Sequence, residues 1–92
     1  MQHYIIVKFK DKTAVDADRI TEIFSAASSI TGVQGAKVHW NCIDRDNRWD
    51  MMIEIEMKKE ALPVYDASKM HHDWKEEFTD CIEKKAIFDC ED

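Results

Sequence analysis

Two segments of the chain alternate hydrophobic and polar residues with the period of two that is typical of a β-strand. They span residues 3–10 and 49–57. The side chains that share the more apolar face, and that we expect to be buried, are His3, Ile5, Val7 and Phe9 in the first segment and Trp49, Met51, Ile53, Ile55 and Met57 in the second. Mixed segments at 36–42 and 85–90 predict two further strands.

Hydrophobic residues with helical spacing lie between the first two predicted strands. Thr13, followed three residues later by Asp16, resembles a capping box and predicts the helix start, and Gly32 predicts its end. The apolar stripe of this helix consists of Ile20, Ile23, Phe24, Ala27 and Ile30.

A second helical region begins at about Lys59. Pro63 predicts a break or shift there, because proline restricts the residue before it and lacks a backbone N–H. From Asp73 onward one helix face is predicted, and it carries Trp74, Phe78, Cys81 and Ile82.

The element order β-α-β-β-α-β predicts a single ferredoxin-like α+β domain over residues 1–92. Its sheet is expected to have four antiparallel strands, with the helices on one face. The other face is then left uncovered, and its apolar residues are expected to be Tyr4, Ile6, Met52, Phe88, Val38 and Trp40. A patch of this kind predicts a homodimer in which two sheets pack face to face, a dimeric α/β barrel. The alternative is a monomer with a mixed, partly hydrated sheet face.

The composition narrows the classes of partner. The chain has 92 residues and a net charge of −6, which disfavours binding to the phosphate backbone of a nucleic acid. No stretch approaches the ~20 apolar residues of a membrane span, and the first residues do not resemble a signal peptide. The three cysteines have no CxxC spacing, so neither a disulfide framework nor a closed zinc site is expected. These features predict a cytoplasmic protein with reduced thiols.

Several motifs together resemble the stress-responsive dimeric α/β-barrel (Dabb) family. His-x-Ile-x-Val-Lys-Phe-Lys at residues 3–10 resembles the first strand of that family. The other matching features are Gly32-Val33 after the first helix, Glu54-Ile55-Glu56 at the end of the third strand, the spacing of Tyr65, His71 and Trp74, and Ile87-Phe88-Asp89 near the end of the chain. The resemblance covers nearly the whole chain and implies the dimeric barrel fold.

Within that family the chain is also similar to plant polyketide cyclases of the olivetolic acid cyclase type. This similarity implies a pocket histidine at His3 and a catalytic pair at Tyr65 and His71. The sequence departs from the cyclases at three places: Met51 replaces a pocket histidine, Ser68-Lys69 replaces a His-Pro pair, and the aromatic residues of the first helix are represented mainly by Phe24. The fold carries over, whereas the cyclase substrate does not follow.

The three candidate catalytic residues suit proton transfer. An imidazole gives or takes a proton near neutral pH, and a phenol stabilises an enolate through a hydrogen bond. They could enolise a carbonyl compound without a cofactor. The ligand pocket is expected between helices and sheet, lined by Ile5, Val7, Phe24, Met51, Ile53, Trp74 and Ile87. The plainer interpretation is that the lining residues are core, Tyr65 packs at a rim and the histidines are ordinary surface residues.

The spacing of Tyr65 and His71 sets a geometric condition. Two residues six apart on one straight α-helix point about 120° away from each other. Their side chains therefore converge only if the helix breaks between them, and Ser68-Lys69 lies in that interval.

A metal site is not expected at His71 and His72, because adjacent helical residues point about 100° apart. Three functions remain open on the sequence alone. The first is a cofactor-free protein that binds or processes a small carbonyl-bearing or aromatic metabolite. The others are a non-enzymatic, stress-associated or ligand-binding barrel, and a cofactor-free monooxygenase.

Overall fold

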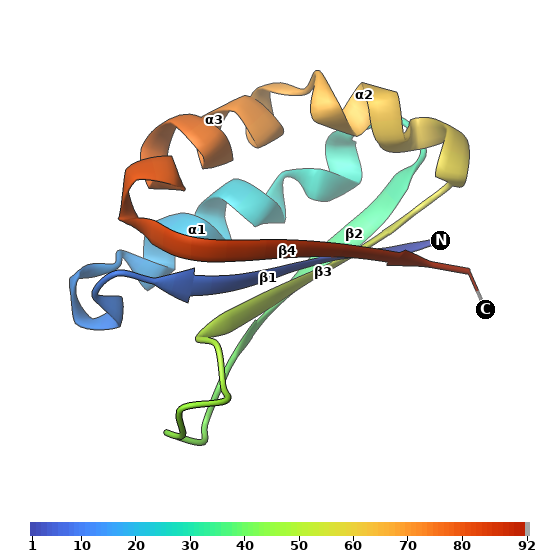
Figure 1. The fold of residues 1–92 in the computed structure, drawn as a ribbon. Coiled ribbons are helices and arrows are strands. Elements are labelled where there is room, and N and C mark those ends of the chain that lie inside the picture. Colours follow the sequence, from blue (N-terminus) through green and yellow to red (C-terminus); the bar gives the residue numbers. More distant parts are fainter. Residues whose placement is uncertain (92) are drawn as a thin grey trace.

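A computed structural model describes residues 1–91 and shows one sheet with helices on one side (Figure 1). The strands lie in the order β2-β3-β1-β4, and all neighbours are antiparallel. The strands are β1 (Gln2–Phe9), β2 (Val33–Trp40), β3 (Met51–Met57) and β4 (Ile82–Cys90). The helices are α1 (Ala17–Ser25), α2 (Leu62–Asp66) and α3 (Lys69–Phe78). The predicted β-α-β-β-α-β order and ferredoxin-like fold are confirmed.

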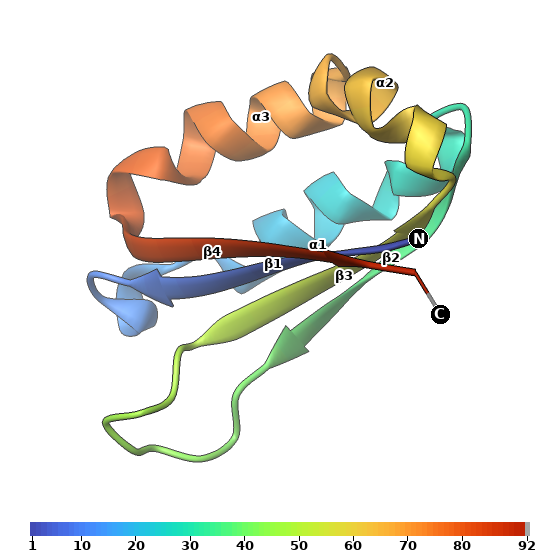
Figure 2. The ribbon, with the colours of Figure 1, turned by 45° about the vertical axis from the view of Figure 1, so that its right-hand side comes forward.

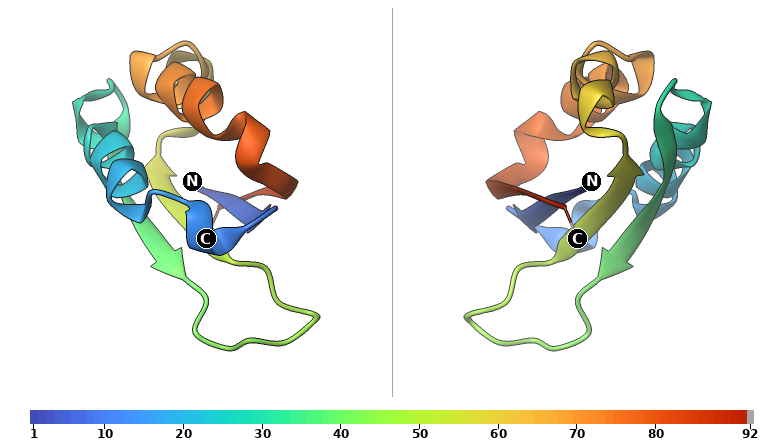
Figure 3. Two further views of the ribbon diagram at one scale, coloured as in Figure 1. Left: turned by 90° about the vertical axis from the view of Figure 1, so that its left-hand side faces the viewer. Right: turned by 90° about the vertical axis from the view of Figure 1, so that its right-hand side faces the viewer.

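The hydrophobic core fills the space between the sheet and the helices, which form two layers in the end-on views of Figure 3. Phe24 of α1 meets Trp74 of α3 edge to face, with ring centroids 5.2 Å apart. Trp74 also stacks on Phe78 at 5.2 Å. Each such aromatic pair adds about 0.5–1.5 kcal/mol beyond the burial of its area. The Phe24–Trp74 contact therefore holds α3 against α1, and the Trp74–Phe78 contact stabilises α3 itself.

Two predicted helix signals act differently from expectation. Helix α1 is capped by Asp16, whose Oδ1 accepts the N–H of Arg19 at 3.0 Å, while Thr13 belongs to a preceding short turn. Pro63 does not break a helix but lies in the first turn of α2. At that position the missing N–H would have had no helical partner, so proline fits there without cost.

The predicted helix end at Gly32 is wrong, because α1 ends at Ser25 and a separate 3-10 turn, Ala27–Ser29, follows it. Gly32 instead forms the turn that leads into β2. Its φ of +85° is in the left-handed region that favours glycine. A Cβ at this position would lie 2.7 Å from the Cβ of Ala61, which is too close for two carbon atoms. The turn therefore requires glycine for both its conformation and its space.

The strand register corrects one prediction about the uncovered sheet face. Val38 pairs with Ile53 and Trp40 with Met51, so both residues lie on the helix-covered side rather than on the open one. The alternation of apolar and polar residues in the sequence could not show which face of β2 turns toward the helices. That direction depends on a register shift near the start of β2. The open face keeps the other four predicted apolar residues, Tyr4, Ile6, Met52 and Phe88.

The edge strand β4 is only partly covered by the helices. Lys85, Ile87 and Asp89 occupy its helix-facing positions, opposite Val7, Ile5 and His3 of β1, and all three are exposed. The loop between β2 and β3 projects beyond the ends of these two strands (Figure 2). Within residues 1–91, no helix is long and apolar enough to cross a membrane.

Candidate functional site

A break in the helical segment brings Tyr65 and His71 together. Helix α2 ends at Asp66 and α3 begins at Lys69. Ser68 links the two helices across the break. Its hydroxyl donates to the carbonyl oxygen of Tyr65 at 2.7 Å and accepts the N–H of His71 at 3.2 Å. The two rings lie with centroids 4.9 Å apart. The helix break that convergence requires is thus present, and Ser68 is its cap.

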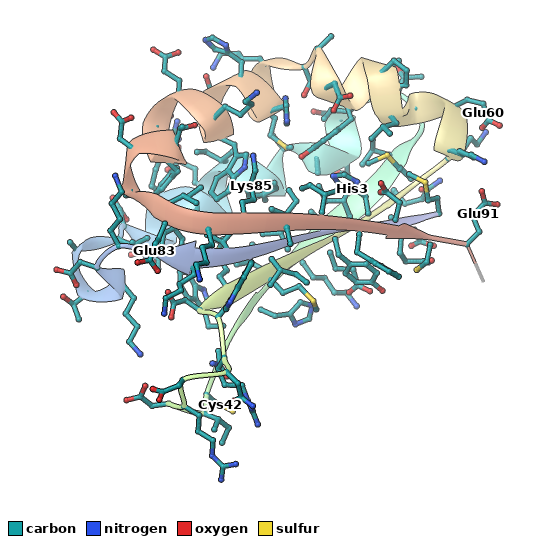
Figure 4. The ribbon with its side chains drawn as sticks, in the orientation of Figure 1. His3, Cys42, Glu60, Glu83, Lys85 and Glu91 are labelled. Carbon is teal, nitrogen blue, oxygen red and sulfur yellow. The ribbon has the colours of Figure 1, made fainter. Side chains whose placement is uncertain are left out.

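His3 reaches the same place from the first strand. Its ring meets that of Tyr65 edge to face, with a centroid distance of 5.4 Å. Figure 4 shows His3 on the helix-facing side of the sheet, beneath α2 and α3. We name His3, Tyr65 and His71 the His–Tyr–His cluster. It joins residues that are far apart in the sequence and come from a strand and two helices.

Asp89 of β4 fixes the orientation of His3. The Nδ1 atom of His3 lies 2.5 Å from Oδ1 of Asp89, and the two residues face each other across the β1–β4 pair. Because a carboxylate only accepts, the Nδ1–H donates, and Nε2 is left as the second polar atom of the ring. A carboxylate in this position locks the tautomer and the rotation of an imidazole.

The hydroxyl of Tyr65 is buried without a hydrogen-bond partner in residues 1–91. The side chain is only 1% exposed. Burial, together with the nearby charge of Asp66, raises the pKa of Tyr65 above its ordinary value. The phenol therefore stays protonated at physiological pH and can act as a hydrogen-bond donor but not as a base.

His71 has the properties of a base at neutral pH. Its Nδ1 lies 2.9 Å from the carbonyl oxygen of Asp66. A carbonyl oxygen only accepts, so Nδ1 carries the hydrogen and the lone pair of the neutral ring is on Nε2. Burial is the main cause that lowers the pKa of His71, and the charges of Lys75 and Lys85 act in the same direction. An open depression of about 480 Å³ adjoins the ring.

The residues predicted to line a pocket are mostly packed together. The side chains that belong to the core and are at most 2% exposed are Ile5, Val7, Phe24, Met51, Ile53 and Trp74. Ile87 differs, because it faces the helix layer from β4 and is 48% exposed. The interior beside the His–Tyr–His cluster is thus filled, and the depression next to His71 is lined by residues of the α2–α3 segment.

Three partners of the cluster were not predicted from the sequence: Asp89, Ser68 and the carbonyl of Asp66. For Asp89 a signal existed, because the predicted fold pairs the first strand with the last and so brings the two ends of the chain together. The register that sets Asp89 opposite His3 is a property of the folded sheet. For Ser68 the signal was its place in the break, together with the preference for serine at helix N-termini.

His72 points away from the cluster. Its Nε2 lies 2.6 Å from Oε2 of Glu76 on the exposed side of α3. His71 and His72 are therefore directed apart. Across residues 1–91 no group of three or more histidine, cysteine, aspartate or glutamate side chains is arranged to hold a metal ion.

A scan of the sequence against protein-family models gives no match, and a search of curated proteins gives none either. Solved structures match over nearly the whole chain. A dimeric ferredoxin-like protein of unknown function from Jannaschia sp. CCS1 is 17% identical, with 99% of this chain and 97% of that chain covered and a TM-score of 0.76. A Dabb family protein with a ferredoxin-like fold from Mesorhizobium loti is 14% identical, with 99% and 94% covered and a TM-score of 0.75.

A hydroxynitrile lyase from Passiflora edulis also matches, at 14% identity, with 95% of this chain and 87% of that chain covered and a TM-score of 0.72. Identities this low establish a shared fold and do not transfer an activity. These structural matches do not test the similarity to polyketide cyclases, which stays a prediction. The chain therefore has the ferredoxin-like fold of the Dabb family protein, and the family resemblance in its sequence is supported at the level of that fold.

Proposed function

We propose that the protein is a cytosolic homodimer whose His–Tyr–His cluster binds a small carbonyl-bearing metabolite and enolises it without a cofactor. The observation that carries this proposal is the buried, unpartnered hydroxyl of Tyr65, whose ring contacts the imidazoles of His3 and His71. An unmet buried donor costs about 1–3 kcal/mol, so its retention is explained if a ligand oxygen accepts its hydrogen bond.

In the proposed reaction, Nε2 of His71 removes a proton from the carbon next to the carbonyl group. The electron pair of the broken C–H bond forms a C=C bond, and the carbonyl π electrons move to oxygen. Tyr65 donates a hydrogen bond to the enolate oxygen that results. His3, held by Asp89, orients the ligand through its second nitrogen. Return of the proton from His71 restores the catalyst.

The substrate is proposed to enter along the flank of β4. Ile87 and Lys85 face the helix layer there and are exposed, so the edge of the site is open to solvent. Because Tyr65 itself is buried, binding also requires the segment around Ser68 to move outward from β4. Hinges of this kind occur where helical pieces meet.

The proposed dimer forms through the open face of the sheet. Tyr4, Ile6, Met52 and Phe88 lie on that face, and Phe88 is 60% exposed. Burial of these side chains against a second copy would remove an apolar patch from water. The matching proteins from Jannaschia and from Thermobifida fusca are described as dimeric, which supports the same assembly here.

A non-enzymatic function is the second candidate, and the filled interior favours it. Phe24 and Met51 occupy the space that a large substrate would need. In this alternative the cluster holds a small ligand, or the dimer itself is the functional product. The lyase from Passiflora edulis shows that a protein of this fold can be an enzyme, which favours the first candidate.

The test is proton exchange on a carbonyl compound. Phenylacetone in D2O, followed by NMR, reports loss of the protons next to its carbonyl group. We expect the protein to accelerate this exchange, and His71→Asn or Tyr65→Phe to slow the accelerated rate by about 10²-fold or more. His72→Asn is the matched control, since its ring points away from the cluster.

Equal exchange in the His71→Asn and His72→Asn proteins would contradict the proposed base. Saturable binding of phenylacetone without any exchange would favour the binding function instead. In that case Tyr65→Phe should still weaken the binding.

A further inference from the structure

A second hollow lies at the opposite end of the sheet from the His–Tyr–His cluster. It is formed between the β2–β3 loop (residues 41–50), whose position Cys42 marks in Figure 4, and the turn that follows β1. Its volume is about 500 Å³, within the range of small-molecule sites. We name it the hairpin-end pocket. It adjoins Phe9, and the length of β1 separates it from His3 by about 20 Å.

The floor of the hairpin-end pocket is aromatic. Trp40 at the end of β2 lines it and is 41% exposed, although its register places it on the helix-facing side. The ring of Trp40 stacks on that of Phe9, with centroids 6.1 Å apart and an angle of 26° between the planes. Phe9 is buried and so supports the indole from below. A supported, half-exposed indole is a surface on which a planar ligand can stack.

The walls of the pocket carry charges of both signs. The cationic residues are Lys8, Lys10, Lys12, Arg45 and Arg48, and the carboxylates are Asp11, Asp44, Asp46 and Asp50. Asp11 and Asp50 already accept backbone N–H groups, at 3.0 and 2.8 Å. Asp44 lies 4.0 Å from Lys12. Three of the four carboxylates thus have a hydrogen-bond or ion-pair partner within the protein.

In the part of the chain that the structure describes, three of the five cationic residues of the pocket have no carboxylate partner. In residues 1–91, Lys10, Arg45 and Arg48 form no ion pair with a carboxylate, although Arg48 donates to the side-chain oxygen of Asn47. A guanidinium presents several N–H donors in a plane and binds carboxylate or phosphate oxygens in pairs.

We propose that the hairpin-end pocket is a second binding site, which takes a small aromatic anion. The ring stacks on Trp40, and a carboxylate or phosphate group on the ligand is held by Arg45 and Arg48. Recognition requires both the stacking on Trp40 and the contact with the arginines, so neither an uncharged ring nor a simple anion should bind as tightly. This site is separate from the cluster that we propose to enolise a carbonyl compound, and it does not depend on that activity.

NMR of the indole N–H groups tests this proposal. The probes are two anion–neutral pairs, indole-3-acetate with indole-3-acetamide and adenosine 5′-monophosphate with adenosine, together with inorganic phosphate alone. The Trp40 signal is assigned from the Trp40→Phe protein. We expect both aromatic anions to shift this signal saturably at millimolar concentration, with a dissociation constant about tenfold lower than that of the neutral partner.

Substitution of the arginines separates the anion contact from the stacking. In the Arg45→Gln/Arg48→Gln protein the preference for the anions should vanish, while the neutral compounds bind as before. Lys75→Gln, which removes a cation from α3 instead, should retain the preference. The single Arg45→Gln change, at an exposed loop position, repeats the comparison if the double change impairs folding.

Four outcomes would overturn the proposal. One is the lack of a saturable shift with either aromatic anion. Another is equal affinity for each anion and its neutral partner. The third is a preference for the anions that survives the loss of both arginines. Binding of phosphate alone as tightly as the aromatic anions would likewise show that Trp40 does not contribute.

Discussion

Replacement of Tyr65 by phenylalanine removes one oxygen atom and leaves the shape of the ring unchanged. The lost hydroxyl is buried and has no partner in residues 1–91. A buried donor without a partner costs about 1–3 kcal/mol of folding free energy. We therefore expect Tyr65→Phe to raise the free energy of unfolding by about 1 kcal/mol, in contrast to most substitutions in a core.

Thermal unfolding is the assay. For a domain of this size, 1 kcal/mol shifts the melting temperature by about 4–8 °C, which circular dichroism resolves. Both proteins are compared at the same concentration, because dimerisation makes the melting temperature depend on concentration. A ligand that accepts the hydrogen bond of Tyr65 should stabilise the wild-type protein more than the variant. The difference in melting temperature between the two proteins should therefore become smaller or change sign when this ligand is added.

Tyr4→Phe is the matched control. The hydroxyl of Tyr4 lies 3.4 Å from Oε1 of Glu54 and is therefore partnered. Its removal should lower the stability by about 0.5–1.5 kcal/mol. If Tyr65→Phe is destabilising to the same degree, the hydroxyl of Tyr65 has a partner in solution, and the inference of a donor awaiting a ligand is wrong.

Four other outcomes are expected. The pKa of His71 is lowered in the folded protein, so the unfolded protein binds more protons at this residue just below the ordinary histidine pKa. The contribution of His71 to stability is therefore complete above the ordinary pKa and is lost as the pH falls toward the folded pKa. NMR titration of the ring checks the lowered pKa, and urea unfolding at several pH values checks the loss of stability. Ile6→Asp would bury an unpaired carboxylate in the proposed dimer, weaken association by roughly 2 kcal/mol or more, and give the 10.8 kDa monomer in light scattering, whereas a stable dimer would refute the interface. Gly32→Ala should lower the unfolding free energy by about 1–3 kcal/mol in chemical denaturation, because of its positive φ and the contact with Ala61; an unchanged midpoint would refute this. Dialysis against a chelator should leave the melting temperature unchanged, and a fall restored only by zinc would show a metal site.

The local pattern of the sequence determined the elements and their order. Alternation in β1 and β3 and the apolar stripe of α1 are produced by the repeat of the backbone itself, so they can be recognised without knowledge of the neighbours. The need for a break between Tyr65 and His71 likewise follows from the helical repeat alone. Gly32 was identifiable because few residues other than glycine adopt its backbone conformation.

Only the tertiary structure decided which side chains meet. The pairing of His3 with Asp89 depends on the register between the two ends of the chain, and the inward direction of Val38 and Trp40 depends on a register shift in β2. The missing partner of the Tyr65 hydroxyl and the stacking of Trp40 on Phe9 arise in the same way. Periodicity fixes the direction of a side chain relative to its own element, whereas register and packing between distant segments fix what it faces.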